Sequence, residues 1–229
     1  MAGGKLTPRQ KMINLMYLIF IAMLALNMSK EVLSAFGLMN EKFEGANSSA
    51  QSSNMQMLAG LDAKASEAGG EFTEAAVTAH KVEAITKNFY DYIGNIKSEV
   101  LVGTEADPET GKLPYEEMDK GDNIDQLWFG PGGYSAKGKE VVATIEKYKS
   151  DMESALGSNT KLKPILSEVN SKFNLDKVKN KDGIAIDYLD YHFKGFPAVA
   201  SLAKLSAWQN DAKKVETDVY NTLLGKAAV

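Results

Sequence analysis

The chain has 229 residues, no cysteine and a formal net charge of −4 at pH 7. A chain of this length can bury a sizeable core, and without cysteine that core is held by packing and not by disulfides. The excess of acidic residues gives no electrostatic basis for binding nucleic acid, so we expect no nucleic-acid partner.

The first predicted element is an apolar stretch from Met12 to Met28, which reads MINLMYLIFIAMLALNM. Only three polar side chains interrupt it: Asn14, Tyr17 and Asn27. A cleavable signal peptide has a shorter apolar core that ends in a small-residue cleavage site, and the residues after Met28 do not form such a site. We therefore expect an uncleaved transmembrane anchor.

This anchor has a recognisable predicted start. Thr7 is a good N-cap and Pro8 suits the first helical position, so a helix from Thr7 to Met28 is about 33 Å long, enough to cross a bilayer. Three basic residues stand ahead of the apolar stretch: Lys5, Arg9 and Lys11. The positive-inside rule then places the N-terminus in the cytoplasm and the bulk of the chain across the membrane.

Two interpretations of Arg9 stay open. Its guanidinium can reach back to lipid headgroups, or it can pair with a carboxylate on another membrane protein, since this chain has no Asp or Glu before Glu31. At about 100° per residue, four residues share one helical stripe that is a candidate partner-facing surface: Arg9, Met16, Phe20 and Asn27. Tyr17 lies beside this stripe, where a tyrosine is most often part of the aromatic belt.

A heptad-like apolar seam follows the anchor. Its first four residues recur at alternating steps of four and three and form our candidate dimer seam: Val32, Phe36, Met39 and Phe43. No Gly or Pro intervenes before Gly37, so we expect the anchor helix to run on into this seam as one continuous rod. The Gly69–Gly70 pair ends the helical pattern.

Later segments alternate between helical periodicity and irregular composition. Helical periodicity is predicted over residues 72–100, 135–156, 162–173 and 197–223. Irregular stretches lie at 103–134 and 174–196, and we expect Trp128 and Phe129 to pin the first of them onto the bundle. The sequence thus predicts an all-α fold. Residues 1–29 hold a short cytoplasmic N-terminus and the transmembrane helix, and residues 30–229 form a periplasmic helical bundle.

No catalytic constellation stands out. There is no cysteine nucleophile, no G-x-S-x-G elbow and no phosphate-binding loop, and the only two histidines are His80 and His192. Were residues 187–193 extended, Asp190 and His192 would share a face and could hold a metal; a loop or hairpin folded onto the bundle is the favoured interpretation. The acidic run at 105–125 lacks EF-hand spacing and predicts a solvated loop. We expect no enzyme activity, no catalytic residues, no cofactor and no metal.

Two segments carry a family resemblance. The opening MAGGKLTPRQKMINLMYLIFIAMLALNMSKEVLSAFGLMNEKFE closely resembles the N-terminus of the GldM (PorM) family, inner-membrane proteins of gliding motility and type IX secretion in Bacteroidetes. The later YHFKGFPAVASLAKLSAWQNDAKKVETDVYNTLL is similar to that family's first periplasmic domain. The resemblance implies a homodimer in the bacterial inner membrane, whose transmembrane helices sit inside a ring of the partner GldL.

The resemblance also implies a mechanism. GldL carries a membrane-embedded glutamate, the pair uses the proton-motive force, and the residue that faces this glutamate corresponds here to Arg9. Tyr17 corresponds to a position within the helix that is polar in this family. A span without acidic residues agrees with this assignment, because it cannot itself bind the proton. The candidate partner-binding and proton-coupling residues are Arg9, Asn14, Met16, Tyr17, Phe20 and Asn27.

Family members continue into β-sandwich domains that engage periplasmic ring proteins. This sequence stops at Val229, so we expect a fragment that ends after the first periplasmic domain. The expected function is that of a motor subunit that transmits energy across the periplasm to power secretion and gliding. The alternative is a signal-anchored periplasmic sensor or scaffold, and an anchored enzyme is the third and weakest hypothesis.

Overall fold

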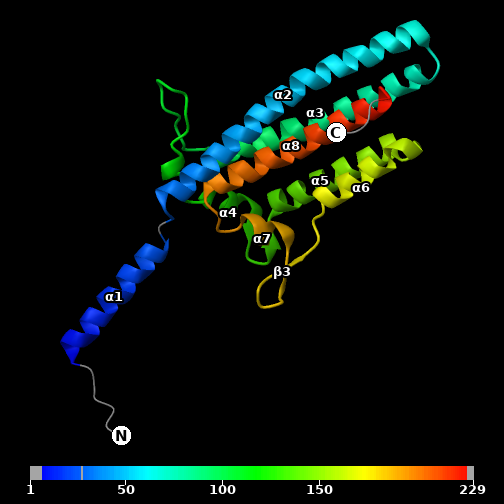
Figure 1. The fold of residues 1–229 in the computed structure, drawn as a ribbon. Helices are drawn as coiled ribbons and strands as arrows, with labels where there is room; N and C mark the ends of the chain where they lie inside the picture. Colours follow the sequence, from blue (N-terminus) through cyan, green and yellow to red (C-terminus); the bar gives the residue numbers. More distant parts are fainter. Residues whose placement is uncertain (1–6, 27, 226–229) are drawn as a thin grey trace.

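The computed structural model describes residues 7–26 and 28–225, and over residues 21–26 it describes the backbone alone. This part of the chain is mostly helical, as predicted (Figure 1). The main helices are α1 (Pro8–Leu26), α2 (Lys30–Ala68), α3 (Glu71–Val100), α5 (Ala136–Leu156), α6 (Lys163–Lys172) and α8 (Ala198–Leu223). The short elements are η1 (Tyr115–Glu117), α4 (Asp122–Trp128), β1 (Phe129–Gly130), β2 (Gly133–Tyr134), η2 (Thr160–Leu162), β3 (Val178–Lys179), β4 (Ala185–Ile186) and α7 (Tyr188–Phe193).

The bundle is arranged around α8. Helices α2 and α3 form an antiparallel pair, joined at Gly69 and Gly70, whose φ angles of 61° and 56° suit glycine. Helix α8 runs parallel to α2 and also contacts α3 and α6, while the α5–α6 pair packs on the other side (Figure 1). The predicted end of the α2 helix at the glycine pair is confirmed.

The main core lies between α3, α5, α6 and α8 and is rich in aromatic rings. Phe89, Tyr148 and Phe173 pack together, with ring centroids 4.6 to 5.4 Å apart. Phe193 lies 5.1 Å from Trp128 and 5.2 Å from Trp208 by ring centroid. Such offset and edge-on contacts add to the stabilisation from burial.

A second, smaller core surrounds the first turns of α2. Leu33 packs there with Met118, Val199 and Leu202. The segment 101–118, which we call the tongue, crosses α2 at this point and brings Tyr115 against Gly37. A Cβ on Gly37 would lie 2.1 Å from the Tyr115 ring, so this close contact requires glycine.

The expected continuous rod is wrong. Helix α1 ends at Leu26, and α2 starts anew at Lys30 behind a separate N-cap, Ser29. The Ser29 backbone is extended, and its Oγ accepts a hydrogen bond from the Val32 amide at 3.3 Å. A serine followed by an acidic first turn is a helix start signal, and here it overrides the apolar periodicity that runs through this region.

The predicted start of α1 is confirmed. Thr7 Oγ1 accepts a hydrogen bond from the Gln10 amide at 3.2 Å, and Pro8 is the first helical residue. Figure 1 shows α1 standing apart from the bundle. Among the described residues, no helix combines the length and the apolar character needed to cross a membrane. The transmembrane helix expected from the sequence therefore stays a prediction.

The two irregular stretches have short elements of their own. The first contains η1, α4 and the β1–β2 hairpin, and Trp128 and Phe129, at the junction of α4 and the hairpin, are buried as predicted. The second contains the β3–β4 hairpin and α7. The expected loop or hairpin around His192 is corrected, because residues 188–193 form a helix that buries Leu189 and Phe193.

Candidate functional site

Helix α1 is apolar and uncovered. Every side chain described in it, from Pro8 to Phe20, is exposed. Met16, Tyr17 and Phe20 have exposed fractions of 66%, 67% and 61%. A helix that is apolar around its circumference is normally buried by lipid or by other proteins. This helix is therefore the first candidate functional surface of the chain.

The described members of the predicted stripe keep their helical spacing, and all of them are exposed. Arg9, Met16 and Phe20 lie on α1, whereas Asn27 lies outside the described residues. Asn14 Oδ1 accepts a hydrogen bond from the Gln10 side chain at 3.2 Å. Within the described residues Arg9 forms no ion pair, so its partner is not assigned by the fold.

The candidate dimer seam lies on α2 beside the face that packs into the bundle. Val32 and Met39 are 44% and 48% exposed, while Phe36 and Phe43 are half-buried. The row that faces the bundle begins one residue later along α2. It comprises Leu33, Gly37, Asn40, Asn47, Asn54, Leu58 and Leu61. The apolar pattern thus marked a neighbouring, largely exposed face of the same helix.

The middle of α2 also lacks charge. No charged residue occurs between Glu44 and Asp62, and the exposed positions there are mostly Ala, Ser and Gly. An exposed helix face normally carries charged side chains, and small uncharged ones let another helix approach closely. The seam and this uncharged stretch form one continuous exposed surface along α2.

The inner row of α2 contains a feature that the sequence reading missed, namely a buried asparagine every seven residues. Asn40, Asn47 and Asn54 are only 1–2% exposed. Seven residues are two helical turns, so the three amides share one face of α2. We call these residues, together with Ser206, Asn210, Lys213, Glu216 and Thr217 of α8, the polar seam. The even spacing was the signal in the sequence.

The first two asparagines pair with one turn of α8. Ser206 Oγ donates to Asn40 Oδ1 at 2.6 Å. Asn47 Nδ2 donates to the Ser206 carbonyl at 3.2 Å, and its Oδ1 accepts from Asn210 Nδ2 at 3.0 Å. Because contacts to higher-numbered residues of α2 reach higher-numbered residues of α8, the two helices are parallel.

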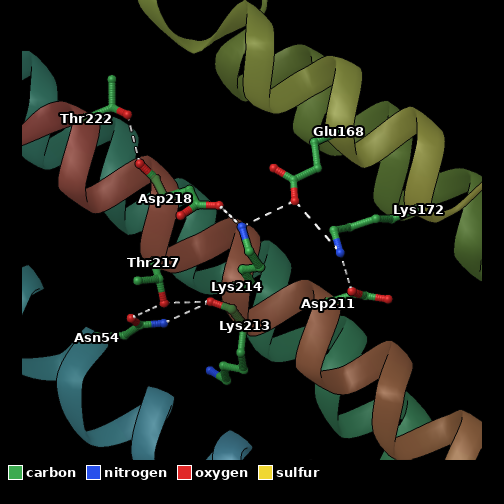
Figure 2. Close-up of polar contacts among 9 residues, drawn as sticks. All are labelled: Asn54, Glu168, Lys172, Asp211, Lys213, Lys214, Thr217, Asp218 and Thr222. Atoms are coloured by element: carbon green, nitrogen blue, oxygen red, sulfur yellow. Dashed lines mark hydrogen bonds and ion pairs between the residues drawn. The ribbon is translucent and has the colours of Figure 1, made fainter. Parts of the chain in front are cut away.

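The third asparagine has the most partners. Asn54 Nδ2 donates to the Lys213 carbonyl at 3.3 Å and to Glu216 Oε2 at 2.9 Å. Its Oδ1 accepts from Thr217 Oγ1 at 2.7 Å. Figure 2 shows this amide of α2 reaching the Lys213 and Thr217 positions on α8. All its contacts lie on one turn of α8.

A buried ion pair completes the polar seam. Lys213 Nζ lies 3.0 Å from Glu216 Oε2, and the two side chains are 5% and 4% exposed. The Tyr220 hydroxyl donates to the other oxygen of this carboxylate, Oε1, at 2.9 Å. Burial, and then the negative charge of Glu216, raise the pKa of Tyr220, which stays a hydrogen-bond donor.

The α6-facing side of α8 carries a second, more exposed charge network (Figure 2). Lys214 Nζ lies 2.7 Å from Asp218 and 3.4 Å from Glu168 of α6. Lys172 of α6 lies 2.5 Å from Asp211. These pairs join α6 to α8 at the solvent boundary, where each ion pair stabilises the fold by at most about 1 kcal/mol.

The described residues hold no group of three or more side chains suited to a metal ion. His80 instead bridges two carboxylates, with Nε2 2.9 Å from Asp62 and Nδ1 3.3 Å from Glu83. Lys204 donates to the His192 carbonyl and lies 3.5 Å from the centroid of the Phe196 ring. Burial lowers the pKa of Lys204 to about 8. These contacts join α2 to α3 and α7 to α8.

Comparison with known proteins places the bundle in a family. Residues 31–226 match the family model described as the GldM N-terminal domain. A comparison with curated proteins gives no match. The matched region begins at the second residue of α2 and takes in α3 to α8, so it covers the polar seam and the candidate dimer seam and leaves α1 outside.

Proposed function

This chain belongs to the GldM family, and from that membership we propose that it is a motor subunit of the gliding and type IX secretion apparatus. In this proposal two copies hold their α1 helices inside a ring of a GldL-like membrane protein. Movement driven by the proton-motive force passes through α2 into the periplasmic bundle. The observation that carries the proposal is an apolar helix whose described side chains are all exposed, followed a few residues later by a bundle that matches the family model.

The anchor is the first part of the proposal to test. If α1 holds the chain in the inner membrane, the protein stays in the membrane fraction after alkaline carbonate washing and keeps its original N-terminus. Exposed apolar residues such as Met16 and Phe20 support this assignment, because water is an unfavourable environment for them. A processed N-terminus after Ala22 would remove α1 and overturn the motor proposal.

Arg9 is the residue proposed to meet the carboxylate of the partner. A guanidinium in a low-dielectric site stabilises an ionised acid and lowers its pKa, and its planar fork can hold both carboxylate oxygens. Arg9→Ala should give normal protein levels and little secretion, and Arg9→Lys should be intermediate. If Arg9 only reaches lipid headgroups, lysine should substitute fully and alanine should have little effect.

The candidate dimer seam gives the proposed contact between copies. Val32 and Met39 are exposed in the single chain, and the uncharged stretch after Glu44 continues the same surface. Single cysteines at Val32 or Met39 should therefore cross-link two copies in membranes. Any cross-link comes from the introduced residue, since the chain has no native cysteine. Lys42→Cys is the matched control on a neighbouring face. Equal cross-linking at all three positions would argue against this seam.

Copurification separates the motor from the alternative sensor or scaffold. A motor subunit should bring down a small polytopic membrane protein with a buried carboxylate. A sensor or scaffold should not depend on Arg9 for its activity. The expected result is that such a protein copurifies with the chain, and that Arg9→Ala keeps this partner while secretion is lost.

A further inference from the structure

The polar seam joins the two helices that matter most for passing a movement through the bundle. Helix α2 follows α1, and α8 is the last helix that the structure describes. The two run parallel and share the most extensive helix–helix contact in the described part of the chain. Any axial displacement of α2 reaches α8 only if the two do not slip past each other.

The seam contacts are of a kind that resists slipping. Hydrogen bonds weaken steeply once the donor and acceptor leave their narrow range of distance and angle, whereas apolar contacts are non-directional. Asn47 and Asn54 donate to two main-chain carbonyls of α8, those of Ser206 and Lys213, at 3.2 and 3.3 Å. A shift of one residue, about 1.5 Å along the axis, would disturb both contacts.

We propose that Asn40, Asn47 and Asn54 set the register of α2 on α8 and prevent axial slip between the two helices. Buried asparagines at heptad positions are known to select register at the expense of stability. Here three occur in succession, and together they pair with a 12-residue segment of α8: Asn40 and Asn47 with the turn from Ser206 to Asn210, and Asn54 with the turn from Lys213 to Thr217. An apolar row at these positions would hold the helices together as well, but would fix their register less strictly.

Removing these amides should not unfold the bundle, because their partners keep other hydrogen bonds. Thr217 Oγ1 still donates to the Lys213 carbonyl at 2.9 Å. Glu216 still accepts from Lys213 and Tyr220. Leucine at positions 47 and 54 therefore removes directional hydrogen bonds from the polar seam without leaving a buried charge unpaired.

Disulfide cross-linking in the cysteine-free chain measures the register. Asn40→Cys with Ser206→Cys reports the observed register, since these side chains are 2.6 Å apart. Asn40→Cys with Ala203→Cys or with Asn210→Cys reports slip of about one turn in either direction. In the otherwise unchanged full chain, the first pair should close about tenfold faster than the others, because a disulfide needs Cα atoms within roughly 7 Å.

The same pairs are then compared in a chain that carries Asn47→Leu and Asn54→Leu. The expected result is that the slipped pairs close nearly as fast as the observed one, while the circular dichroism spectrum stays helical. An undiminished preference for the 40/206 pair would overturn the proposal. The matched control is Leu58→Ala with Leu61→Ala, which should lower the thermal midpoint and leave the preference intact. Loss of preference in this control would show general loosening and would also overturn the proposal.

The consequence for movement rests on the proposed function, and a separate measurement tests it. The Asn47→Leu, Asn54→Leu chain should secrete poorly at matched expression, and the Asn40→Cys, Ser206→Cys disulfide should restore secretion. If register is lost but secretion is normal, the seam sets register without carrying the movement. If register is kept, the assignment of these asparagines fails, whatever the protein does.

Discussion

The two sides of α8 are built from different side chains although they belong to the same helix. From Ser206 onward, the side towards α2 presents Ser206, Asn210, Lys213 and Thr217, whereas the opposite side of the helix presents Leu205, Trp208, Ala212, Val215 and Val219. Apolar burial supplies most of the folding free energy and tolerates small displacements. Directional polar contacts contribute less to stability and more to a unique arrangement. The contacts that supply most of the folding free energy and the contacts that fix the register thus lie on different sides of α8.

The largest expected effect is on the apolar side. Phe173 is 1% exposed and packs against Phe89 and Tyr148. Phe173→Ala should lower the free energy of unfolding by about 3–5 kcal/mol, through lost burial and the cavity that remains. Urea unfolding of the detergent-solubilised chain, followed by circular dichroism, measures this. The control Leu38→Ala, at a 62% exposed position, should change the value by less than about 0.5 kcal/mol.

The next effect separates an ion pair from an unpaired charge within the polar seam. Glu216→Ala leaves the buried Lys213 ammonium without its carboxylate and should destabilise the chain by about 3 kcal/mol. Replacing both residues, Lys213→Met with Glu216→Leu, should recover most of that loss, because neither charge then remains buried. If the double variant is as unstable as the single one, the ion pair itself stabilises the fold. The two sides of α8 would then differ less in their contribution to stability than we propose.

A smaller effect is expected where the tongue crosses α2. Gly37→Ala forces the Tyr115 ring to move, which should lower the free energy of unfolding by about 1–2 kcal/mol. The better helix propensity of alanine offsets part of this loss. Adding Tyr115→Ala should remove the clash, although the hydrogen bond from Tyr115 to Glu41 at 3.0 Å is then lost. Limited proteolysis of the tongue should accelerate in both variants. An unchanged cleavage rate would show that Gly37 is not needed for the contact.

Much of the architecture could be predicted from helical periodicity and turn residues. The starts of α1, α5 and α8 follow from Thr7, Ser135 and Pro197, because caps and prolines act locally. The break between α1 and α2 was missed because the apolar pattern runs through it, while Ser29 supplies a stronger local signal. Periodicity does not reveal which face meets which partner.

The face of α2 that packs into the bundle shows this limit. An apolar row at Val32, Phe36, Met39 and Phe43 suggests the seam, but the buried row contains asparagines. Asn47 is buried because α8 offers it matching donors and acceptors, and that pairing depends on a helix some 160 residues later. The seven-residue spacing of the asparagines is visible in the α2 sequence, but the α8 residues that match them cannot be read from that segment alone. The proposed roles of Arg9 and Tyr17 also depend on a partner and stay predictions.

The smallest expected effect concerns pH and the far end of the α2–α3 pair. His80 of α3 bridges Asp62 of α2 and Glu83, and the hydrogen bond to Asp62 is the largest cause that raises the pKa of His80 above 6.5. A raised pKa means that the folded chain binds the proton more tightly than the unfolded chain. The stabilisation is therefore complete below pH 6.5 and is lost as pH rises through the folded-state pKa.

Because these side chains are half exposed, solvent screening keeps the effect small. His80→Gln retains hydrogen bonding without the charge, so it should lower the thermal midpoint by at most about 2 °C at low pH and leave it unchanged near pH 9. Asp62→Asn should reproduce this pH dependence, since it removes the main partner of the imidazolium. A difference that is equal at both pH values would assign the contact to packing. The His80 contacts would then stabilise the fold by packing, as the apolar side of α8 does. The contrast between polar contacts that fix the register and apolar contacts that stabilise the fold would hold only for the asparagine row.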